Sequence, residues 1–137
     1  MPGPAPSGRK PPSETRILVA DDEAGVREFI TRGLSSAGYQ VTAAEDGEHA
    51  LQRLAEATEQ GFSYDLLITD IMMPQIDGIS LALIATRDHR EMKVIMISGY
   101  ADARARAYNL EALIQQIMEK PFSLQELLSH VDTALNA

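Results

Sequence analysis

The hydrophobic and polar positions of the chain follow two alternating patterns. Short apolar runs occur at residues 17–20, 41–43, 66–69 and 94–97, with a less regular run at 113–118. Runs of this length are typical of buried strands, and the longer stretches between them carry the apolar spacing of amphipathic helices. Five strands alternating with five helices predict an α/β fold, in which helices cover both faces of a five-stranded parallel sheet.

Apolar spacing and turn residues predict where the helices lie. The first is expected over about residues 24–37, the second begins near Asp46, and the third follows Asp77, which we interpret as a turn residue. The fourth begins near Asp102, and the last begins at Ser123, where Ser-Leu-Gln-Glu forms a capping box. The residues of the first helix expected to face the sheet are Val26, Phe29, Ile30 and Leu34.

Residues 1–15 differ in composition from the rest of the chain. They hold five of its seven prolines and have no apolar periodicity, so we expect a disordered proline-rich extension outside the fold. Residues 16–137 then form a single domain, long enough to bury roughly two-thirds of the surface of the unfolded chain. Only 17 residues follow Lys120, which leaves room for one helix and no further domain.

Composition and charge exclude several classes of function. The net charge of −8 and the pI near 4.8 argue against nucleic acid as the main partner, because nucleic-acid binding requires a basic surface. No apolar stretch approaches the ~18 residues of a membrane helix, so we expect no membrane insertion. The chain contains no cysteine, which excludes disulfides and thiolate metal sites and makes the cytoplasm the simplest expected location.

Polar side chains follow four of the predicted strands. Asp21 and Asp22 come directly after the first strand, Asp70 after the third, Ser98 after the fourth and Lys120 after the fifth. In a parallel sheet the carboxyl ends of the strands lie along one edge, where open α/β proteins bind their ligands. We therefore expect these side chains to converge in space although they are far apart in the sequence.

The charges of these residues favour a metal site with phosphoryl chemistry. Three carboxylates close together repel one another, which raises their pKa values unless cations neutralise them. A divalent cation and the ammonium of Lys120 would balance the three negative charges, and ligands that are all oxygen favour Mg²⁺. Asp70 beside Mg²⁺ and Lys120 is then a candidate nucleophile toward phosphorus, with Ser98 as a further hydrogen-bond donor.

Four short motifs at these strand ends occur in a fixed order along the chain. They are the acidic pair Asp21 and Asp22, D-x-x-M-P-x-x-D-G at 70–78, Ser98 followed by Gly99, and K-P-F at 120–122. Together they resemble the receiver domain of two-component response regulators, the chemotaxis-regulator-like family, over about residues 15–135. The resemblance, and not the spacing, implies a flavodoxin-like fold with strand order 2-1-3-4-5.

The resemblance also implies a role for each residue of the site. Asp70 would accept a phosphoryl group from a histidine kinase or a histidine phosphotransfer protein. Asp22 and Asp70 would bind Mg²⁺ directly, together with the main-chain carbonyl of Met72, while Asp21 would act largely through water. Lys120 would pair with the phosphoryl group.

The signal would leave the site through Ser98, and here the chain departs from the family pattern. Ser98 would move toward the phosphoryl group and remodel the surface formed by the fourth helix, the last strand and the last helix. Most receivers carry Tyr or Phe three residues before the lysine, and this chain carries Ile117 there. Tyr100 is a candidate substitute for that aromatic. A subset of stand-alone receivers, which act as protease adaptors or phosphate relays, has the same aliphatic replacement.

The predicted function is that of a stand-alone signalling receiver, which is not an enzyme and acts on a downstream protein target as a monomer or weak dimer. Two alternatives remain open at this point. A degenerate receiver would bind a partner constitutively, with Ile117 marking a lost switch. An aspartyl-phosphate phosphatase would share the nucleophile and Mg²⁺, but that class usually needs a second aspartate two residues after the nucleophile, where this chain has Met72.

Overall fold

The computed structural model describes residues 10–99 and 116–137 and contains a five-stranded parallel sheet. The strand order is β2-β1-β3-β4-β5, so both the predicted α/β class and the topology implied by the resemblance are confirmed. The strands are β1 (Arg16–Ala20), β2 (Gln40–Ala44), β3 (Leu66–Asp70), β4 (Lys93–Ser98) and β5 (Gln116–Glu119).

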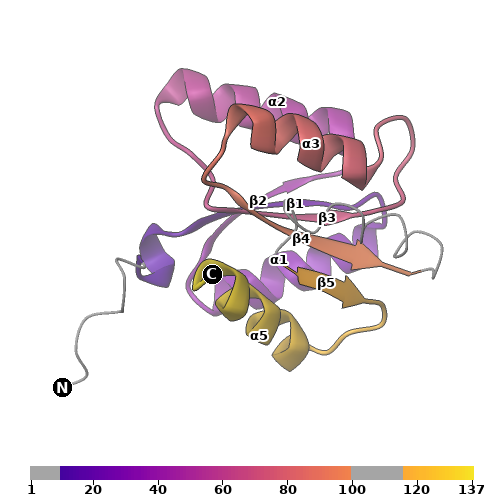
Figure 1. Ribbon diagram of the computed structural model, residues 1–137. Helices are drawn as coiled ribbons and strands as arrows, with labels where there is room; N and C mark the ends of the chain where they lie inside the picture. The colour runs from indigo at the N-terminus through magenta and orange to yellow at the C-terminus, as the bar shows by residue number, and fades with distance from the viewer. Residues whose placement is uncertain (1–9, 100–115) are drawn as a thin grey trace.

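Helices cover both faces of the sheet (Figure 1). α2 and α3 lie side by side on one face, and α1 and α5 lie on the other. The helix expected near Asp102 falls outside the described residues. The described helices are α1 (Ala24–Ser36), α2 (Gly47–Gln60), α3 (Gly78–Asp88) and α5 (Leu124–Leu135).

The central strands β1, β3 and β4 are buried at almost every position because both of their faces are covered. Successive side chains of a strand point to opposite faces of the sheet. Leu18 and Leu67 therefore join the buried cluster beneath α2 and α3, whereas their neighbours Val19 and Ile68 join the cluster beneath α1 and α5. This double burial fixes β1 and β3 as a rigid platform for the residues that follow them.

The face of α1 that contacts the sheet is narrower than the apolar spacing predicted. Ile30 and Leu34 are fully buried and Val26 is partly buried, but Phe29 is 42% exposed. The prediction was wrong for Phe29 because spacing defines an apolar stripe without showing how much of it the neighbouring elements cover. The Phe29 ring instead packs at the rim of the α1–α5 interface, 5.9 Å from the ring of Phe122.

Residues 10–15, part of the stretch expected to be disordered, are ordered against the sheet. Pro12–Glu14 forms a 3-10 turn, for which proline has the required backbone angle. Thr15 is buried, and Lys10 forms an ion pair with Asp65, with 2.7 Å between Nζ and Oδ1. The fold therefore includes these six residues, and the extension that we predicted concerns residues outside the described part.

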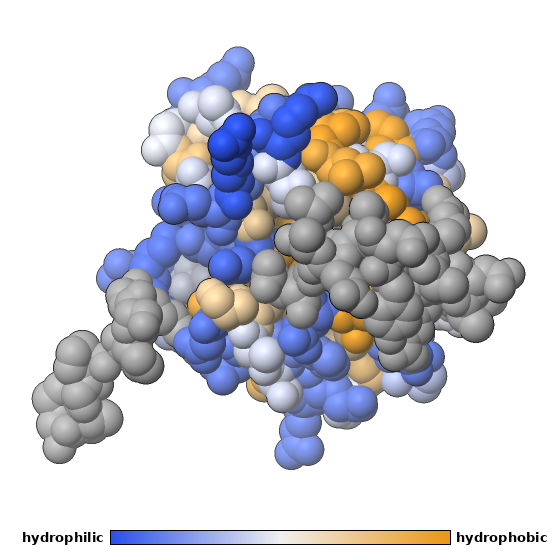
Figure 2. Space-filling model, in the orientation of Figure 1, coloured by the Kyte–Doolittle hydropathy of each residue, from blue (hydrophilic) through white to orange (hydrophobic). Residues whose placement is uncertain are grey.

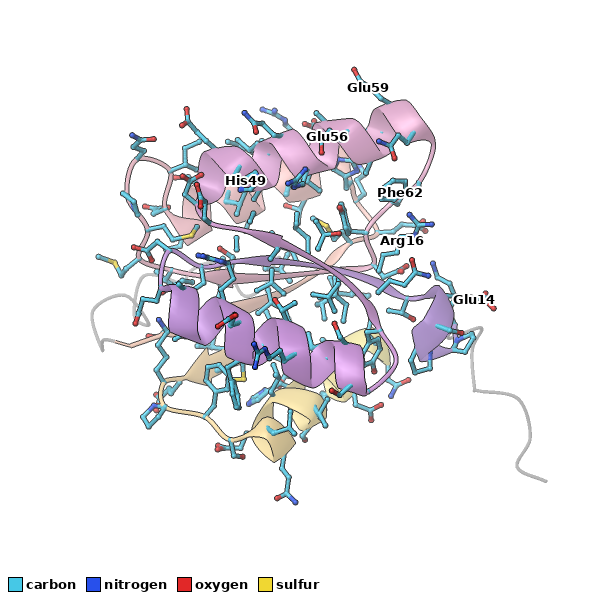
Figure 3. All side chains as sticks on the ribbon, turned by 180° about the vertical axis from the view of Figure 1, so that it is seen from behind. Glu14, Arg16, His49, Glu56, Glu59 and Phe62 are labelled. Carbon is cyan, nitrogen blue, oxygen red and sulfur yellow. The ribbon has the colours of Figure 1, made fainter. Side chains whose placement is uncertain are left out.

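Side-chain contacts close the amino-terminal edge of the sheet. The guanidinium of Arg16 lies 4.0 Å from the centre of the Phe62 ring, and Figure 3 shows the two side chains facing each other. The Phe62 ring packs edge-on against Tyr64, and the main-chain N–H of Arg16 donates to the carboxylate of Asp65 at 2.9 Å. This edge is filled by packing, whereas the opposite edge carries the polar residues.

Side-chain caps begin the helices at the polar edge. Asp46 accepts a hydrogen bond from the main-chain N–H of His49 at the start of α2. The predicted capping box at the start of α5 is confirmed, because Ser123 and Glu126 each accept from the main-chain N–H of the other. The caps satisfy N–H groups that the first helical turn leaves without partners.

The surface in view in Figure 2 is mostly hydrophilic, with an apolar area over α3, where Leu83 is 44% exposed. In the part of the chain that the structure describes, no helix combines the length and apolar character needed to cross a membrane.

Candidate functional site

The polar residues predicted to converge do so at the carboxyl edge of the sheet. Asp21 follows β1 directly, Asp70 is the last residue of β3, and Ser98 is the last residue of β4. The register between β4 and β5 pairs Ser98 with Glu119, which places Lys120 directly beyond this pair. The sheet topology thus brings residues from four strand ends together.

Lys120 is the centre of the site. Its ammonium donates hydrogen bonds to Asp70 Oδ2 at 2.8 Å and to Glu23 Oε1 at 2.6 Å. Asp21 Oδ2 lies 3.6 Å from the same nitrogen, within ion-pair distance. One cation is therefore shared among three carboxylates, two from the loop between β1 and α1 and one from the end of β3.

Asp21, Asp22 and Asp70 form a group that could hold a cation. Each offers a carboxylate oxygen, and the three oxygens lie within 4.8 Å of one another. Asp21 is fully buried, and its Oδ2 has no hydrogen-bond partner, whereas Asp22 is exposed to solvent. A buried carboxylate oxygen without a hydrogen bond is an unfavourable arrangement that a divalent cation would relieve.

The electrostatics of the site follow from burial and the shared ammonium. Burial is the largest cause that raises the pKa of Asp21 to about 6, and the negative charge of Asp70 adds to it. A hydrogen bond from the main-chain N–H of Glu23 and the charge of Lys120 act in the opposite direction. Burial lowers the pKa of Lys120, but its hydrogen bonds to Asp70 and Glu23 outweigh burial and hold that pKa above its usual range.

An open cleft of about 430 Å³ gives solvent access to Asp70 and Lys120. Met72 lies at its border, where the side chain is 47% exposed and the main-chain N–H donates to Asp70 Oδ1 at 3.1 Å. Asp70 therefore has one oxygen held by Met72 and the other by Lys120. The main-chain carbonyl of Met72 stays a predicted metal ligand. The cleft is lined by Asp22, Glu23, Asp70, Met72, Gly99 and Lys120.

Ser98 and Ile117 lie next to the site without lining the cleft. Ser98 is buried, and its main-chain carbonyl accepts from the N–H of Lys120 at 3.0 Å. Ile117 is partly buried in β5, opposite Met96, and packs against the cluster beneath α2 and α3. Tyr100, the proposed substitute aromatic, falls outside the described residues. The movement assigned to Ser98 stays a prediction.

The turn after Asp70 requires glycine at position 78. The N–H of Gly78 donates to the carbonyl of Ile71 at 2.9 Å, which folds the loop back onto the end of β3. A Cβ atom at this position would lie 1.9 Å from the carbonyl oxygen of Asp70. Asp77 caps α3 by accepting from the main-chain N–H of Ser80, which agrees with its interpretation as a turn residue.

Sequence reasoning assigned no role to Glu23, although it is part of the site. The acidic run after β1 continues through position 23, but adjacency alone does not show which carboxylates reach an ammonium 97 residues away. The sequence offered one indication, the charge balance of the site. That balance included three carboxylates, whereas the structure brings four together. The peptide bond between Lys120 and Pro121 is cis.

Comparison with known proteins identifies the family of this chain. The model of the response regulator receiver domain matches residues 17–132. This chain belongs to the response regulator receiver family. It is 35% identical over 122 residues to the response regulator receiver protein CpdR of Brucella abortus, covering 89% of this chain and 98% of that protein. It is 33% identical to the response regulator MprA of Mycobacterium ulcerans but spans only 50% of that longer relative.

Solved structures of receivers share the fold. A response regulator receiver domain protein from Clostridium thermocellum superimposes with a TM-score of 0.77 and 27% identity, covering 89% of this chain and 94% of that one. The response regulator TrrA of Thermotoga maritima, solved in complex with Mg²⁺-BeF, gives a TM-score of 0.73 and 32% identity, covering 88% and 98% of the two chains. These structures therefore support a receiver fold for this chain.

Proposed function

We propose that this chain is a phospho-accepting receiver in which Asp70 takes a phosphoryl group from the phosphohistidine of a histidine kinase or a histidine phosphotransfer protein. The observation that carries the proposal is the environment of Asp70. Its carboxylate is nearly buried, lines an open cleft and lies 2.8 Å from the ammonium of Lys120. A carboxylate in that position can reach phosphorus, and the ammonium can stabilise negative charge on the phosphoryl oxygens.

The transfer forms one bond and breaks one. A carboxylate oxygen of Asp70 bonds to phosphorus as the phosphorus–nitrogen bond of the donor breaks, and the bonding pair stays with the imidazole nitrogen. Lys120 donates to the phosphoryl oxygens, and the proposed movement of Ser98 brings a second donor. Hydrolysis would end the phosphorylated state. The oxygen of water attacks phosphorus, the bonding pair returns to Asp70, and both protons of the water leave with inorganic phosphate.

Mg²⁺ is the proposed cofactor, and the residues present fit it. The donor atoms are all oxygens, and a buried oxygen of Asp21 has no hydrogen-bond partner. Asp22, Asp70 and the main-chain carbonyl of Met72 would hold the ion directly, and Asp21 would act largely through water. When bound, Mg²⁺ would neutralise negative charge on the phosphoryl oxygens.

The output would run through protein contacts and not through turnover of a substrate. A protease adaptor or a phosphate relay is the proposed type, because Ile117 replaces the usual aromatic as it does in stand-alone receivers of those kinds. The similarity to the response regulator receiver protein CpdR extends over 98% of that protein, which supports a receiver function. The proposed location is the cytoplasm, because the sequence contains no cysteine. The proposed oligomeric state is a monomer or a weak dimer.

Incubation with acetyl phosphate and Mg²⁺, followed by mass spectrometry of the intact protein, tests the proposal. We expect a gain of one phosphoryl group that disappears in Asp70→Asn and on chelation of Mg²⁺. Asp88→Asn is the matched control, because Asp88 is exposed at the far end of α3. This variant should gain the phosphoryl group to the same extent as the protein without substitution. Absence of the adduct at saturating donor and Mg²⁺ would refute the proposal.

The same experiment separates the two alternatives. A degenerate receiver would remain unmodified and bind its partner equally well with and without donor. A phosphatase would release phosphate rapidly from many phosphomonoesters, and Met72 in the position of the usual second aspartate argues against that activity. A slowly decaying adduct on Asp70 is compatible only with the phospho-accepting receiver.

A further inference from the structure

Glu23 makes a contact with the reacting centre that the proposed function leaves unused. Its carboxylate oxygen lies 2.6 Å from Lys120 Nζ, a shorter distance than the 2.8 Å between Lys120 and Asp70. The Glu23 side chain is 60% exposed and the Lys120 side chain only 18%, so Glu23 covers the ammonium from the side of solvent. Glu23 also lines the cleft through which a donor would approach.

The position of Glu23 in the fold explains why its carboxylate is free to reach the lysine. Glu23 is the N-cap of α1, and its side chain makes no capping hydrogen bond there. Its main-chain N–H donates to Asp21 Oδ1 at 2.8 Å, which fixes the start of the side chain beside the site. The backbone is therefore anchored to one acidic residue of the site while the side chain reaches across to Lys120.

The ammonium of Lys120 has three N–H donors, and two of them are used by Asp70 and Glu23. Asp21 lies beside the same nitrogen at 3.6 Å. A phosphoryl group on Asp70 needs donors from Lys120, and it carries more negative charge than the carboxylate it replaces. Glu23 then competes with the phosphoryl oxygens for the ammonium and repels them as they approach.

We propose that Glu23 is a positioning residue that holds Lys120 in a shared state and so limits how readily anionic phosphodonors modify Asp70. This inference rests on the proposed function and adds to it a basis for donor choice. A small anionic donor meets the charge of Glu23 without compensation. A protein donor can present a cationic side chain to the exposed carboxylate of Glu23 as it docks, which releases the lysine. The site would therefore favour protein donors over small metabolites.

The test compares Glu23→Gln with the unmodified sequence for phosphorylation by two small donors in the presence of Mg²⁺. Acetyl phosphate carries more net negative charge than the zwitterionic phosphoramidate. We expect the rate with acetyl phosphate to rise about three- to tenfold, the effect of one unit charge a few ångströms away in a partly exposed site. The gain should be smaller with phosphoramidate and should shrink as ionic strength increases.

Glu59→Gln is the matched control. Glu59 is an exposed residue at the end of α2 remote from the strand ends that form the site, as Figure 3 shows, and its substitution removes the same charge. It should leave both rates unchanged. Mg²⁺ affinity measured on each variant accounts for any change in metal occupancy, and thermal unfolding accounts for any loss of fold. A general structural effect of Glu23→Gln would alter both donors equally.

A second measurement keeps this inference separate from the proposed function. Binding of Mg²⁺ and beryllofluoride, followed by ¹⁹F NMR, needs no phosphoryl transfer, and Glu23→Gln should bind the fluoride complex more tightly than Glu59→Gln. Failure of every form to be phosphorylated would reject the proposed function, while tighter binding of beryllofluoride would still support the role of Glu23. Unchanged or lower rates and affinities in Glu23→Gln would overturn the inference.

Discussion

Asp21→Asn is expected to stabilise the metal-free protein, because Asp21 carries a charge in a place that penalises it. The residue is fully buried, and its Oδ2 lacks a hydrogen-bond partner. Burial is the main cause that raises its pKa from 3.8 to about 6. Asparagine keeps the oxygen that accepts from Glu23 and removes the negative charge.

The size of the effect follows from the pKa. The folded state binds the proton of Asp21 more tightly than the unfolded state does, so the free energy of unfolding falls as the pH rises between about 4 and 6. A shift of about two pKa units corresponds to about 3 kcal/mol. The asparagine amide would face the ammonium of Lys120, which reduces the net gain to about 1–3 kcal/mol above this pH range.

The assay is urea unfolding followed by far-ultraviolet circular dichroism, in the presence of EDTA, at several pH values. Near neutral pH, the free energy of unfolding should be larger for Asp21→Asn than for the protein without substitution. The two free energies should approach each other as the pH falls from about 6 to about 4, the range set by the pKa of Asp21. Millimolar Mg²⁺ should then stabilise the unmodified protein more than the variant, because only the former retains the charge that attracts the cation. Parallel stability curves at every pH, or a variant that is less stable near neutral pH without metal, would refute this reasoning.

Three further predictions concern the scaffold. Gly78→Ala should lower the free energy of unfolding by about 3 kcal/mol or more, because its Cβ would meet the carbonyl of Asp70 at 1.9 Å; Gly25→Ala, with nothing within 4 Å of the added atom, should be neutral or slightly stabilising in the same urea titration. Ser123→Ala should cost about 1 kcal/mol through loss of the α5 cap, and a thermal shift below experimental error would contradict it. Leu67→Ala, in the fully buried centre of β3, should cost about 2–5 kcal/mol by denaturant unfolding, and near-native stability would show that the core collapses around the cavity.

The strands could be predicted because burial on both faces leaves a strong signal. β1, β3 and β4 each contain a short run of consecutive apolar residues, which is typical of a strand covered on both faces when helical spacing separates the runs. The strand order came from the resemblance, since periodicity does not show which strands are neighbours. Phe29 was misplaced for a related reason, because its exposure depends on how far α5 extends across α1.

The convergence of Asp21, Asp70 and Lys120 could be predicted because topology requires it. Each lies at the end of a strand or directly after it, and parallel strands end at one edge whatever their separation in the sequence. Glu23 could not be assigned in the same way. Whether it caps α1, faces solvent or reaches Lys120 depends on the side-chain path, and all three are open to a residue at a helix start. Position in the topology is readable from sequence, whereas the choice among local partners is not.

The same distinction separates the chemistry of this receiver from its output. Asp21 and Asp70 are fixed by the ends of β1 and β3, which are covered on both faces, so their positions follow from the fold. Ile117 lies in β5, where only part of its side chain is buried, and an aliphatic side chain offers neither a ring nor a hydroxyl that could report a movement of Ser98. We therefore expect a signal at this position to travel through side-chain packing or through the main-chain hydrogen bond between β4 and β5. In that bond the N–H of Lys120 donates to the carbonyl of Ser98. That hydrogen bond links the two residues expected to contact a phosphoryl group, and we expect it to carry a change at either residue to the end of β5.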